Sequence, residues 1–428
     1  MKKYENYKDS GIKWIGEIPE HWKVMKMKFV ANLKSGSNIT SEQINDNGKY
    51  PVYGGNGLRG YYHKYTNDGD SVLIGRQGAL CGNIKFVSDK FWASEHAVVV
   101  YLFEKNHWVW FGKLLEVMNL NQYSQSAAQP GLSVNEIVNL SIPVPILEEQ
   151  SQIANYLDHK CTQIDELISK KLSLIELLKE ERTAVINQAV TKGIDPSVPM
   201  QNSGIEWIGE TPAHWEVKKL KYILNTTKGF AFKAEMFKDE GIPIIKASDI
   251  KNKSVRENVT HYLDESNAHK FKSVKLFEGD ILISTVGSTP DVINSAVGQI
   301  GRVPLELNGA FLNQNTVRLE ISDFSKITGD YLFFLIQNDN YRRYLDLHAH
   351  GTANQASLKL VDILRFDAVI PTLDEQVEIV DFIRREENRI VTLGKKINKE
   401  ITLMKEYKTT LISEVVTGKV DVRDEIIN

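Results

Sequence analysis

Two short stretches of this chain repeat each other closely. Residues 10–22 read SGIKWIGEIPEHW and residues 203–215 read SGIEWIGETPAHW. A second pair of matching stretches, PILEEQ at 145–150 and PTLDEQ at 371–376, lies at a larger shift, so the second copy has gained residues between its markers. An internal repeat of this kind means that one structural unit occurs twice. We therefore expect two similar halves that differ in the length of their loops.

Each half ends in a stretch of about 40 residues with the apolar period of a long α-helix. The acidic pairs Glu148-Glu149 and Asp374-Glu375 stand near the start of each stretch, where the helix dipole favours acids, and Gly193 and Gly418 mark the ends. Each helix should be roughly 60 Å long at ~1.5 Å per residue. The apolar residues predicted to form the helix-pair interface are Ile164, Leu167, Ile175, Leu178, Val185, Ile390, Leu393, Ile397, Ile401, Met404 and Leu411.

Two packing partners are open to these apolar stripes. The stripes match each other in period and chemistry, which favours a coiled coil of the two helices. The alternative is that each stripe covers the core of its own globular domain, as most amphipathic surface helices do. We favour the coiled coil because neither stripe can be covered along its whole length by one small domain.

The rest of each half contains short β-rich runs between Gly- and Asn-rich turns. The expected fold class is α+β, with two α/β domains in pseudo-twofold repeat, separated by two long helices. The predicted segments are an N-terminal repeated segment 1–22, a first module 23–146, a central helix 147–193, a linker with the second repeated segment 194–215, a second module 216–371, a C-terminal helix 372–418 and a tail 419–428.

Composition limits the class of protein. The net charge of −3 and the isoelectric point near 6.4 do not show the basic excess that is usual in nucleic-acid-binding proteins. Only Cys81 and Cys161 occur, without a C-x-x-C pair, so neither a disulfide framework nor a thiolate zinc site is supported. No apolar run approaches the ~18 residues of a membrane span, and no secretory signal is present. We expect a cytoplasmic protein without membrane contact.

The glycine-rich segment at residues 53–60, YGGNGLRG, contains a formal G-x-G-x-x-G. A dinucleotide fold requires such a motif to open a helix, whereas this one opens onto the bulky run YYHKY, so a nucleotide site is disfavoured. Two interpretations stay open. The glycines form a hairpin that turns the chain, or they form a loop that brings Asn56, Arg59 and Tyr61 to a polyanion.

A second candidate site follows the strand-like run at residues 72–74. Arg76 and Gln77 stand in Gly-Arg-Gln-Gly, and Thr285 and Ser288 hold the corresponding place in the second half. Arg and Gln can read guanine and adenine edges bidentately, although a tight turn with exposed polar residues is the plainer interpretation. We add Lys246 and Ser248 as candidate DNA contacts in the second module.

No catalytic or metal-binding pattern emerges from the sequence. The repeated W-I-G-E-x-P-x-H-W block favours packing over ligand binding, and the histidines lack Cys, Asp or Glu at ligand spacing. There is no Asn/Asp-Pro-Pro-aromatic loop, no G-x-x-x-x-G-K-[ST], no nuclease carboxylate cluster and no G-x-S-x-G. We therefore expect no catalytic residue, no metal and no cofactor in this chain.

The whole chain resembles the specificity subunits of type I restriction-modification systems. The resemblance rests on GIKWIGEIPEHW, YPVYGGNGLRGYY, LIGRQGALCGNIKFVSDKFWASEHAVVV, LEEQSQIANYLDHKCTQIDELI, AVINQAVTKGI and VVTGKVDVR. It implies two target-recognition domains, each of which reads one half of a bipartite, asymmetric double-stranded DNA target. It also implies that the two long helices are antiparallel and set the spacing between the domains. They would dock two methyltransferase subunits, and through them restriction and translocase subunits.

In such a complex the partner subunits would bind S-adenosylmethionine, ATP and Mg, and this chain would be non-catalytic. Two alternatives of other classes are a fused DNA methyltransferase or nuclease with its own active site, and a coiled-coil structural adaptor. Methyl transfer by the isolated chain would favour the first. Failure to bind DNA together with a cognate methyltransferase would favour the second.

Overall fold

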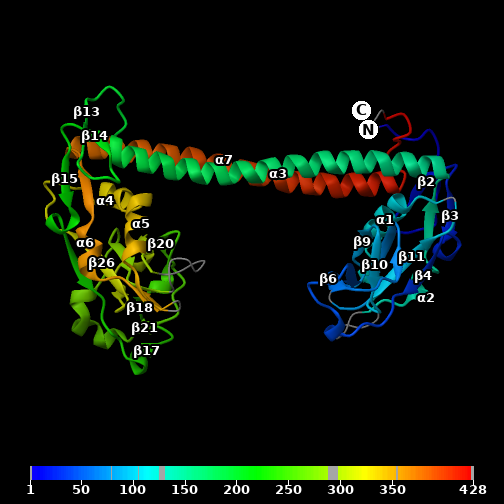
Figure 1. Ribbon diagram of the computed structural model, residues 1–428, viewed down its shortest axis with the longest axis horizontal. Helices are drawn as coiled ribbons and strands as arrows, with labels where there is room; N and C mark the ends of the chain where they lie inside the picture. Colours follow the sequence, from blue (N-terminus) through cyan, green and yellow to red (C-terminus); the bar gives the residue numbers. More distant parts are fainter. Residues whose placement is uncertain are drawn as a thin grey trace. The chain divides into compact units, whose positions relative to one another are not determined.

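The computed structural model describes residues 2–78, 80–104, 106–124, 131–287, 297–352 and 355–425 (Figure 1). The chain divides into two compact units. The first unit comprises Met1–Leu172 with Ile397–Asn428, and the second comprises Ser173–Lys396. Each long helix runs from one unit into the other, so each unit is completed by a part of the opposite half of the sequence.

The first unit contains two four-stranded β-sheets and two two-stranded ones. Its strands are β1 Tyr7–Asp9, β2 Glu17–Pro19, β3 Lys23–Lys26, β4 Ala31–Ser35, β5 Tyr50–Gly54, β6 Gly57–Tyr62, β7 Asn67–Asp68, β8 Ser71–Gly75, β9 Ile84–Val87, β10 Lys90–Ala93, β11 Ala97–Leu102 and β12 Ser141–Val144. One antiparallel sheet has the order β4-β11-β8-β9, and a mixed sheet has the order β6-β5-β10-β7. Helix α1, Trp108–Val117, covers the first sheet, with α2, Val134–Ile137, beside it.

The second unit repeats this plan with additional strands. Its strands are β13 Met200–Asn202, β14 Glu210–Pro212, β15 Glu216–Lys219, β16 Leu224–Lys228, β17 Phe237–Lys238, β18 Ile242–Ile245, β19 Ile250–Lys251, β20 Lys253–Val255, β21 Tyr262–Leu263, β22 Ile281–Ser284, β23 Val286–Gly287, β24 Ile300–Arg302, β25 Phe311–Leu312, β26 Thr316–Ile321, β27 His350–Thr352, β28 Gln355–Ser357 and β29 Asp367–Ile370. Its helices before the long one are α4 Gly329–Leu335, α5 Asp339–His348 and α6 Leu360–Arg365.

The central sheets of the two units correspond strand for strand. The order β4-β11-β8-β9 of the first unit becomes β16-β26-β22-β24 in the second, where β20 and β19 extend the sheet at one edge. These two added strands account for part of the extra length of the second copy. The predicted α+β fold with two repeated halves is therefore confirmed, while the finer division into modules, linker and tail stays a prediction.

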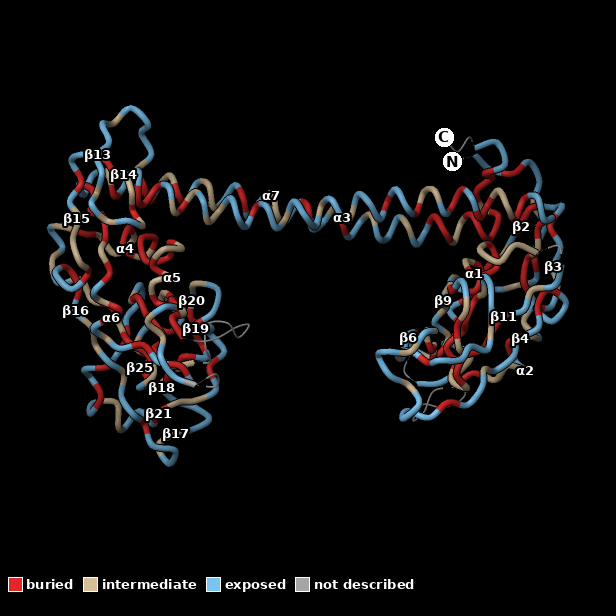
Figure 2. Tube along the Cα trace, in the orientation of Figure 1, coloured by how far each residue is buried: buried red, intermediate tan, exposed pale blue. Residues whose placement is uncertain are grey.

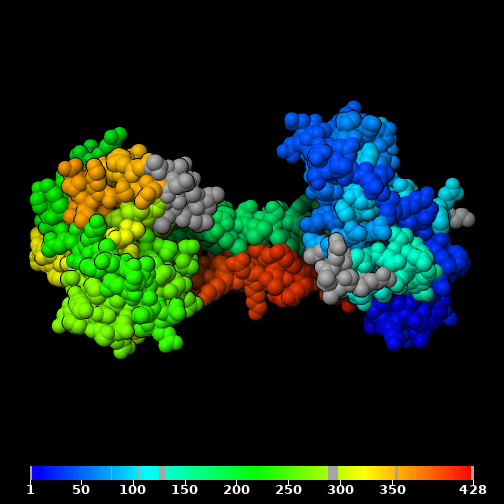
Figure 3. Space-filling view, turned by 90° about the horizontal axis from the view of Figure 1, so that it is seen from below, coloured from blue at the N-terminus to red at the C-terminus, as the bar shows by residue number. Residues whose placement is uncertain are grey.

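The two long helices are α3, Leu147–Lys192, and α7, Leu373–Val416. In the first unit Lys408 pairs with Asp165 at 2.6 Å and Lys171 pairs with Glu400 at 2.5 Å. A higher number on α3 thus faces a lower number on α7, so the helices are antiparallel. In the second unit Arg182–Glu387 and Arg389–Glu181 follow the same rule. Figures 1 and 3 both show the helices side by side.

The apolar stripe on α3 differs at one step from the predicted one. Leu167 is 47% exposed, and Ile168 packs against the core in its place. A step of four residues from Ile164 keeps the stripe under α7, whereas Leu167 lies about 100° round the helix from Ile168. Leu167 therefore lies outside the contact between the two helices. Further along, Ile186 is buried and the predicted Val185 is only half-buried.

The other predicted interface residues lie on the inner faces. Ile164, Leu178, Ile390, Ile397, Ile401 and Leu411 are buried, and Ile175, Leu393 and Met404 are half-buried.

The helices also complete the cores of the globular modules. In the first unit Leu411 and Val415 of α7 share one apolar cluster with Trp110 of α1 and Ile153 of α3. In the second unit Val190 of α3 lies in the same cluster as the module's own residues. Both proposed packing modes therefore occur. Figure 2 shows buried residues gathered towards the ends of each long helix, with exposed residues dominating its middle.

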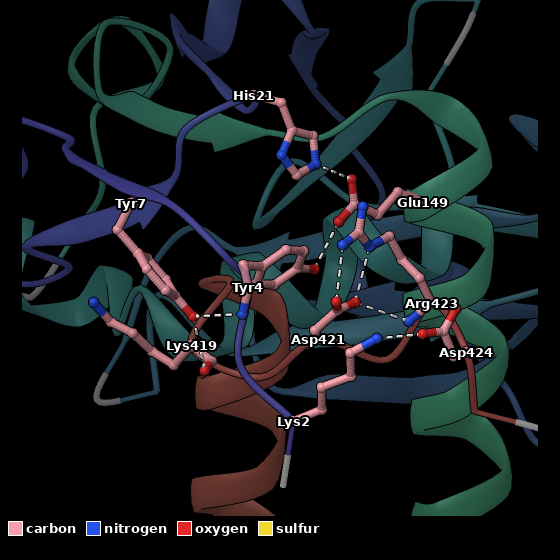
Figure 4. A network of polar contacts seen from close by, with 9 residues as sticks. All are labelled: Lys2, Tyr4, Tyr7, His21, Glu149, Lys419, Asp421, Arg423 and Asp424. Carbon is pink, nitrogen blue, oxygen red and sulfur yellow. Dashed lines mark hydrogen bonds and ion pairs between the residues drawn. The ribbon is translucent and has the colours of Figure 1, made fainter.

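The first and last residues of the described chain meet at the start of α3 (Figure 4). Glu149 is buried and accepts hydrogen bonds from the Tyr4 hydroxyl at 2.6 Å and from Nε2 of His21 at 2.9 Å. Burial, together with the bond to Glu149, raises the pKa of Tyr4. The Asp421 amide donates to the carbonyl oxygen of Lys2 at 2.9 Å. These contacts fasten the N-terminal segment to the residues that follow α7.

The second unit has a corresponding arrangement at the start of α7. Glu375 accepts hydrogen bonds from Nε2 of His214 at 2.7 Å and from Nε1 of Trp215 at 3.1 Å, and Thr372 also donates to it. Burial alone would raise the pKa of Glu375, but these hydrogen bonds lower it to about 2. The repeated W-I-G-E-x-P-x-H-W block therefore docks on a glutamate in each unit. Its last tryptophans, Trp22 and Trp215, are buried, in line with the expected packing role.

Cys81 and Cys161 are buried free thiols. Among the described helices, none combines the length and the apolarity that crossing a membrane requires.

The helix pair generates a first prediction. Ile401→Asp should lower the thermal unfolding temperature of the isolated chain by several degrees, because a 5% exposed side chain worth ~1.5–3 kcal/mol is lost and a charge is buried. Leu403→Asp, two residues on and 53% exposed, is the matched control and should stay within about 0.5 kcal/mol of the wild type. Calorimetry measures both, and equal losses would contradict the packing.

The Glu375 contacts generate a pH prediction. The pKa of this carboxyl is about 2 in the folded chain against an ordinary value of 4.5, so the unfolded chain binds the proton first as the pH falls. The stabilisation is fully present above about pH 4.5 and is lost as the pH falls toward 2. The difference in unfolding temperature between wild type and Glu375→Gln should therefore narrow over this window. A difference that does not change with pH would refute the proposed linkage.

Candidate nucleic-acid interface

The glycine hairpin and the Arg76-Gln77 turn of the first module lie against each other. A Cβ on Gly55 would stand 2.6 Å from the Gln77 carbonyl oxygen, and one on Gly75 would stand 2.2 Å from the Gly55 oxygen. Both glycines are therefore needed because two backbones approach more closely than a side chain allows. The structure thus brings together two motifs that the sequence analysis treated separately.

The side chains of this turn are held by neighbouring strands. Nη1 of Arg76 donates to the Ser35 hydroxyl at 3.1 Å. Oε1 of Gln77 lies 2.7 Å from Nδ1 of His96, and Nε2 of His96 lies 3.0 Å from Oε1 of Glu95. A network of this kind limits the rotamers of Arg76 and Gln77 before any ligand binds.

The remaining candidates of the first module are exposed on the hairpin. Asn56 lies in the turn between β5 and β6, and Arg59 and Tyr61 lie on β6. Lys85 is close by, since its Cε would lie 3.4 Å from a Cβ on Gly57. Arg59 and Lys85 thus place two basic side chains at the hairpin, although the net charge of the chain is −3.

The candidates of the second module have different surroundings. Lys246 is half-buried with its ammonium 4.5 Å from the centre of the Phe237 ring, and burial lowers its pKa. Ser248 is exposed, and its carbonyl oxygen accepts a hydrogen bond from Arg256 at 2.7 Å. Thr285 is 6% exposed and its hydroxyl donates to the Asn315 carbonyl oxygen. Its burial corrects the prediction that the Thr285 side chain contacts DNA. Ser288 lies outside the described residues.

A cavity of about 250 Å³ adjoins Ser248 in the second module. It is lined by Ala247, Ser248, Ile250, Lys251, Asn252, Arg256 and Gln299. Lys, Arg, Asn and Gln are side chains that contact phosphates and base edges in protein–DNA complexes. Lys251, Asn252, Arg256 and Gln299 were not among the predicted residues. The first three lie on or beside strands β19 and β20, which have no counterpart in the first module.

The two candidate faces share one backbone frame. The Arg76 amide donates to the His96 oxygen and the Arg76 oxygen accepts from Leu132, while Thr285 makes the same two bonds with Asn315 and Leu358. Gln77 and Val286 then occupy equivalent places, since Gln77 forms a β-bridge with Gly131 and Val286 pairs with Ser357. The predicted correspondence of the two turns is therefore confirmed at the backbone, and the side chains on it differ.

His96 and Glu95 were also missed as members of the first face. No spacing rule in the sequence links Glu95-His96 to Arg76-Gln77. Within the described ranges no group of three or more His, Cys, Asp or Glu side chains is arranged to hold a metal ion.

Comparison with known proteins identifies the class. The family described as type I restriction modification DNA specificity domain matches residues 19–177 and 212–403, one match in each half. The chain is 25% identical over 438 aligned positions to the MjaVIII specificity subunit of Methanocaldococcus jannaschii, covering 99% of this chain and 97% of that one. It is 38% identical over 161 residues to the EcoprrI specificity subunit of Escherichia coli, covering 37% of this chain and 40% of that one.

Solved structures share the fold at low sequence identity. A chain from a study of complex assembly and conformational transition of the type I R-M system matches with a TM-score of 0.68 at 14% identity, covering 94% of this chain and 99% of that one. The HsdS subunit from Thermoanaerobacter tengcongensis matches with a TM-score of 0.55 at 15% identity, covering 94% and 98%.

The chain belongs to the family of type I restriction modification DNA specificity domains. It is a specificity subunit, which recognises DNA and is not catalytic. The resemblance noted in the sequence is thereby confirmed.

The close glycine contact generates a prediction for this face. Gly55→Ala should force the hairpin away from the Gln77 and His96 carbonyl oxygens and destabilise the chain by about 1–3 kcal/mol. Gly394→Ala is the control, since a Cβ there meets no atom outside its own helix within 4 Å and alanine favours a helix by ~1 kcal/mol. Denaturant titration compares the two variants. A neutral Gly55→Ala would mean that the two motifs are not in close contact.

Proposed function

We propose that this chain is the subunit that selects the DNA sequence on which a type I restriction-modification enzyme acts. Each module would read one half of a bipartite, asymmetric target, through the hairpin and Arg76-Gln77 face in the first module and the face beside Ser248 in the second. The observation that carries this proposal is the shared backbone frame with different side chains. Two equivalent backbone frames are suited to the same kind of DNA contact. The side chains on them differ, Arg76 and Gln77 in the first module and Thr285 and Val286 in the second, so the two modules would read different sequences.

Local charge supports DNA as the ligand. Arg59 and Lys85 lie at the hairpin of the first face, and Lys251 and Arg256 line the cavity of the second. Phosphate contacts from such side chains position a protein on DNA, and base-edge contacts specify the sequence. A net charge of −3 is compatible with this if the partner subunits also contact the DNA.

The long helices supply the proposed docking surface for two methyltransferase subunits. Their outer faces expose large apolar side chains that neither helix covers. These are Leu167, Leu172, Leu174 and Leu177 on α3 and Val391, Leu403 and Tyr407 on α7. Exposed apolar side chains in this number mark a protein interaction surface. Restriction and translocase subunits would then join through the methyltransferases.

In this proposal the partner subunits bind S-adenosylmethionine, ATP and Mg, and the complex works in the cytoplasm. The antiparallel helices would also set the distance between the two half-sites, because a helix is a stiff element of fixed rise per residue.

Module exchange tests the proposal. The chain is expressed with its methyltransferase in a host without type I systems, and the methylated sequences are mapped genome-wide. Replacement of residues 23–146 by the equivalent module of a relative should change one half-site and leave the other half-site and the gap unchanged. If both half-sites change, the modules do not read independently.

A further inference from the structure

A short hydrogen-bonded relay on the first face determines which way one exposed amide points. Gln77 is exposed, and its Oε1 lies 2.7 Å from Nδ1 of His96. The other ring nitrogen of His96 lies 3.0 Å from Oε1 of Glu95. The second carboxylate oxygen of Glu95 accepts the backbone amide of Ile39 at 3.3 Å, which ties the relay to the fold.

The chemistry of the three groups sets the direction of each bond. An ionised carboxylate only accepts hydrogen bonds, so Nε2 of His96 must carry a proton. An amide oxygen likewise only accepts hydrogen bonds, so the contact between Oε1 of Gln77 and Nδ1 of His96 requires Nδ1 to donate. That proton can be donated only to the oxygen of the Gln77 amide. The amide NH2 group of Gln77 is then directed away from His96.

The orientation of this amide limits what Gln77 can recognise. Glutamine reads adenine with its oxygen and its NH2 group together, but here the oxygen is engaged by His96. Within the described residues its NH2 group has no hydrogen-bond partner, and such a group donates two hydrogen bonds and accepts none. Guanine presents two neighbouring acceptors, N7 and O6, in the major groove, which match two donors.

This relay is confined to the first module. Val286 stands at the place of Gln77 and Asn315 at the place of His96, on the same backbone frame. Valine offers no hydrogen bond, so the equivalent place in the second module lacks this donor. Any base preference set by the relay must therefore appear in one half-site alone.

We propose that Gln77 reads a base edge that carries hydrogen-bond acceptors, above all that of guanine, in the half-site of the first module. This inference rests on the proposed function. His96 and Glu95 are positioning residues that hold the Gln77 amide with its donors outward.

The test uses the full chain expressed with its methyltransferase and maps methylated sequences. Gln77→Glu keeps the shape but replaces the outward donors by an acceptor. It should reduce the preference for guanine at one base pair of one half-site by roughly tenfold, in favour of bases with an exposed amino group. His96→Phe leaves the Gln77 amide free to turn, so the same base pair should become less selective. Gln201→Glu, an exposed glutamine on β13, is the matched control and should change nothing.

Two results would overturn the proposal. One is an unchanged half-site in Gln77→Glu; the other is a change at several positions or in both half-sites. If His96→Phe lowers the unfolding temperature, the proposal is judged by Gln77→Glu alone. The Gln77 side chain is exposed, and glutamate has nearly the same shape, so this variant should fold normally. A wild-type chain that directs methylation to no bipartite sequence would instead refute the proposed function.

Discussion

The apolar stripes of α3 and α7 are the constraint on which the rest of the fold depends. A helix of 46 residues beside a module of modest size leaves most of its stripe uncovered, and a second helix of matching period covers it. In the first unit the end of α7 also enters the core beneath α1, and in the second unit the end of α3 does the same. Each module is therefore completed by a helix from the other half of the sequence. The ion pairs that cross between the helices add little, because such exposed pairs contribute ~0–1 kcal/mol each.

The contact between the repeated block and the start of a long helix recurs in both units. Glu149 and Glu375 each accept a hydrogen bond from the histidine of the repeated block. In the second unit the block precedes the second module within one continuous chain, whereas in the first unit it is fastened to the residues that follow α7 through Lys2 and Asp421. The same interaction thus anchors an internal linker in the second unit and the N-terminal segment in the first.

Sequence reasoning recovered what depends on periodicity and repetition. The long helices and the correspondence of the two turns follow from matching positions in two copies of one unit, whereas the antiparallel direction of the helices was expected only from the family resemblance. It failed where the answer depends on a single helical step or on contacts between distant strands. Leu167 and Ile168 are both apolar, and only the packing of α7 selects Ile168. Thr285 is polar at a turn, yet its hydroxyl is satisfied within the fold. His96 meets Gln77 only because β8 and β11 are paired, which no local pattern in the sequence reveals.

The central claim is that each module contacts its own half of the target DNA. Site-specific photo-crosslinking tests this most directly, with a crosslinking residue placed at Asn56 or at Ser248, which are both exposed. The full chain is assembled with its methyltransferase on a duplex that carries the methylated sequence. We predict that position 56 crosslinks to one half-site and position 248 to the other. Crosslinks from both positions to the same half-site would contradict the account.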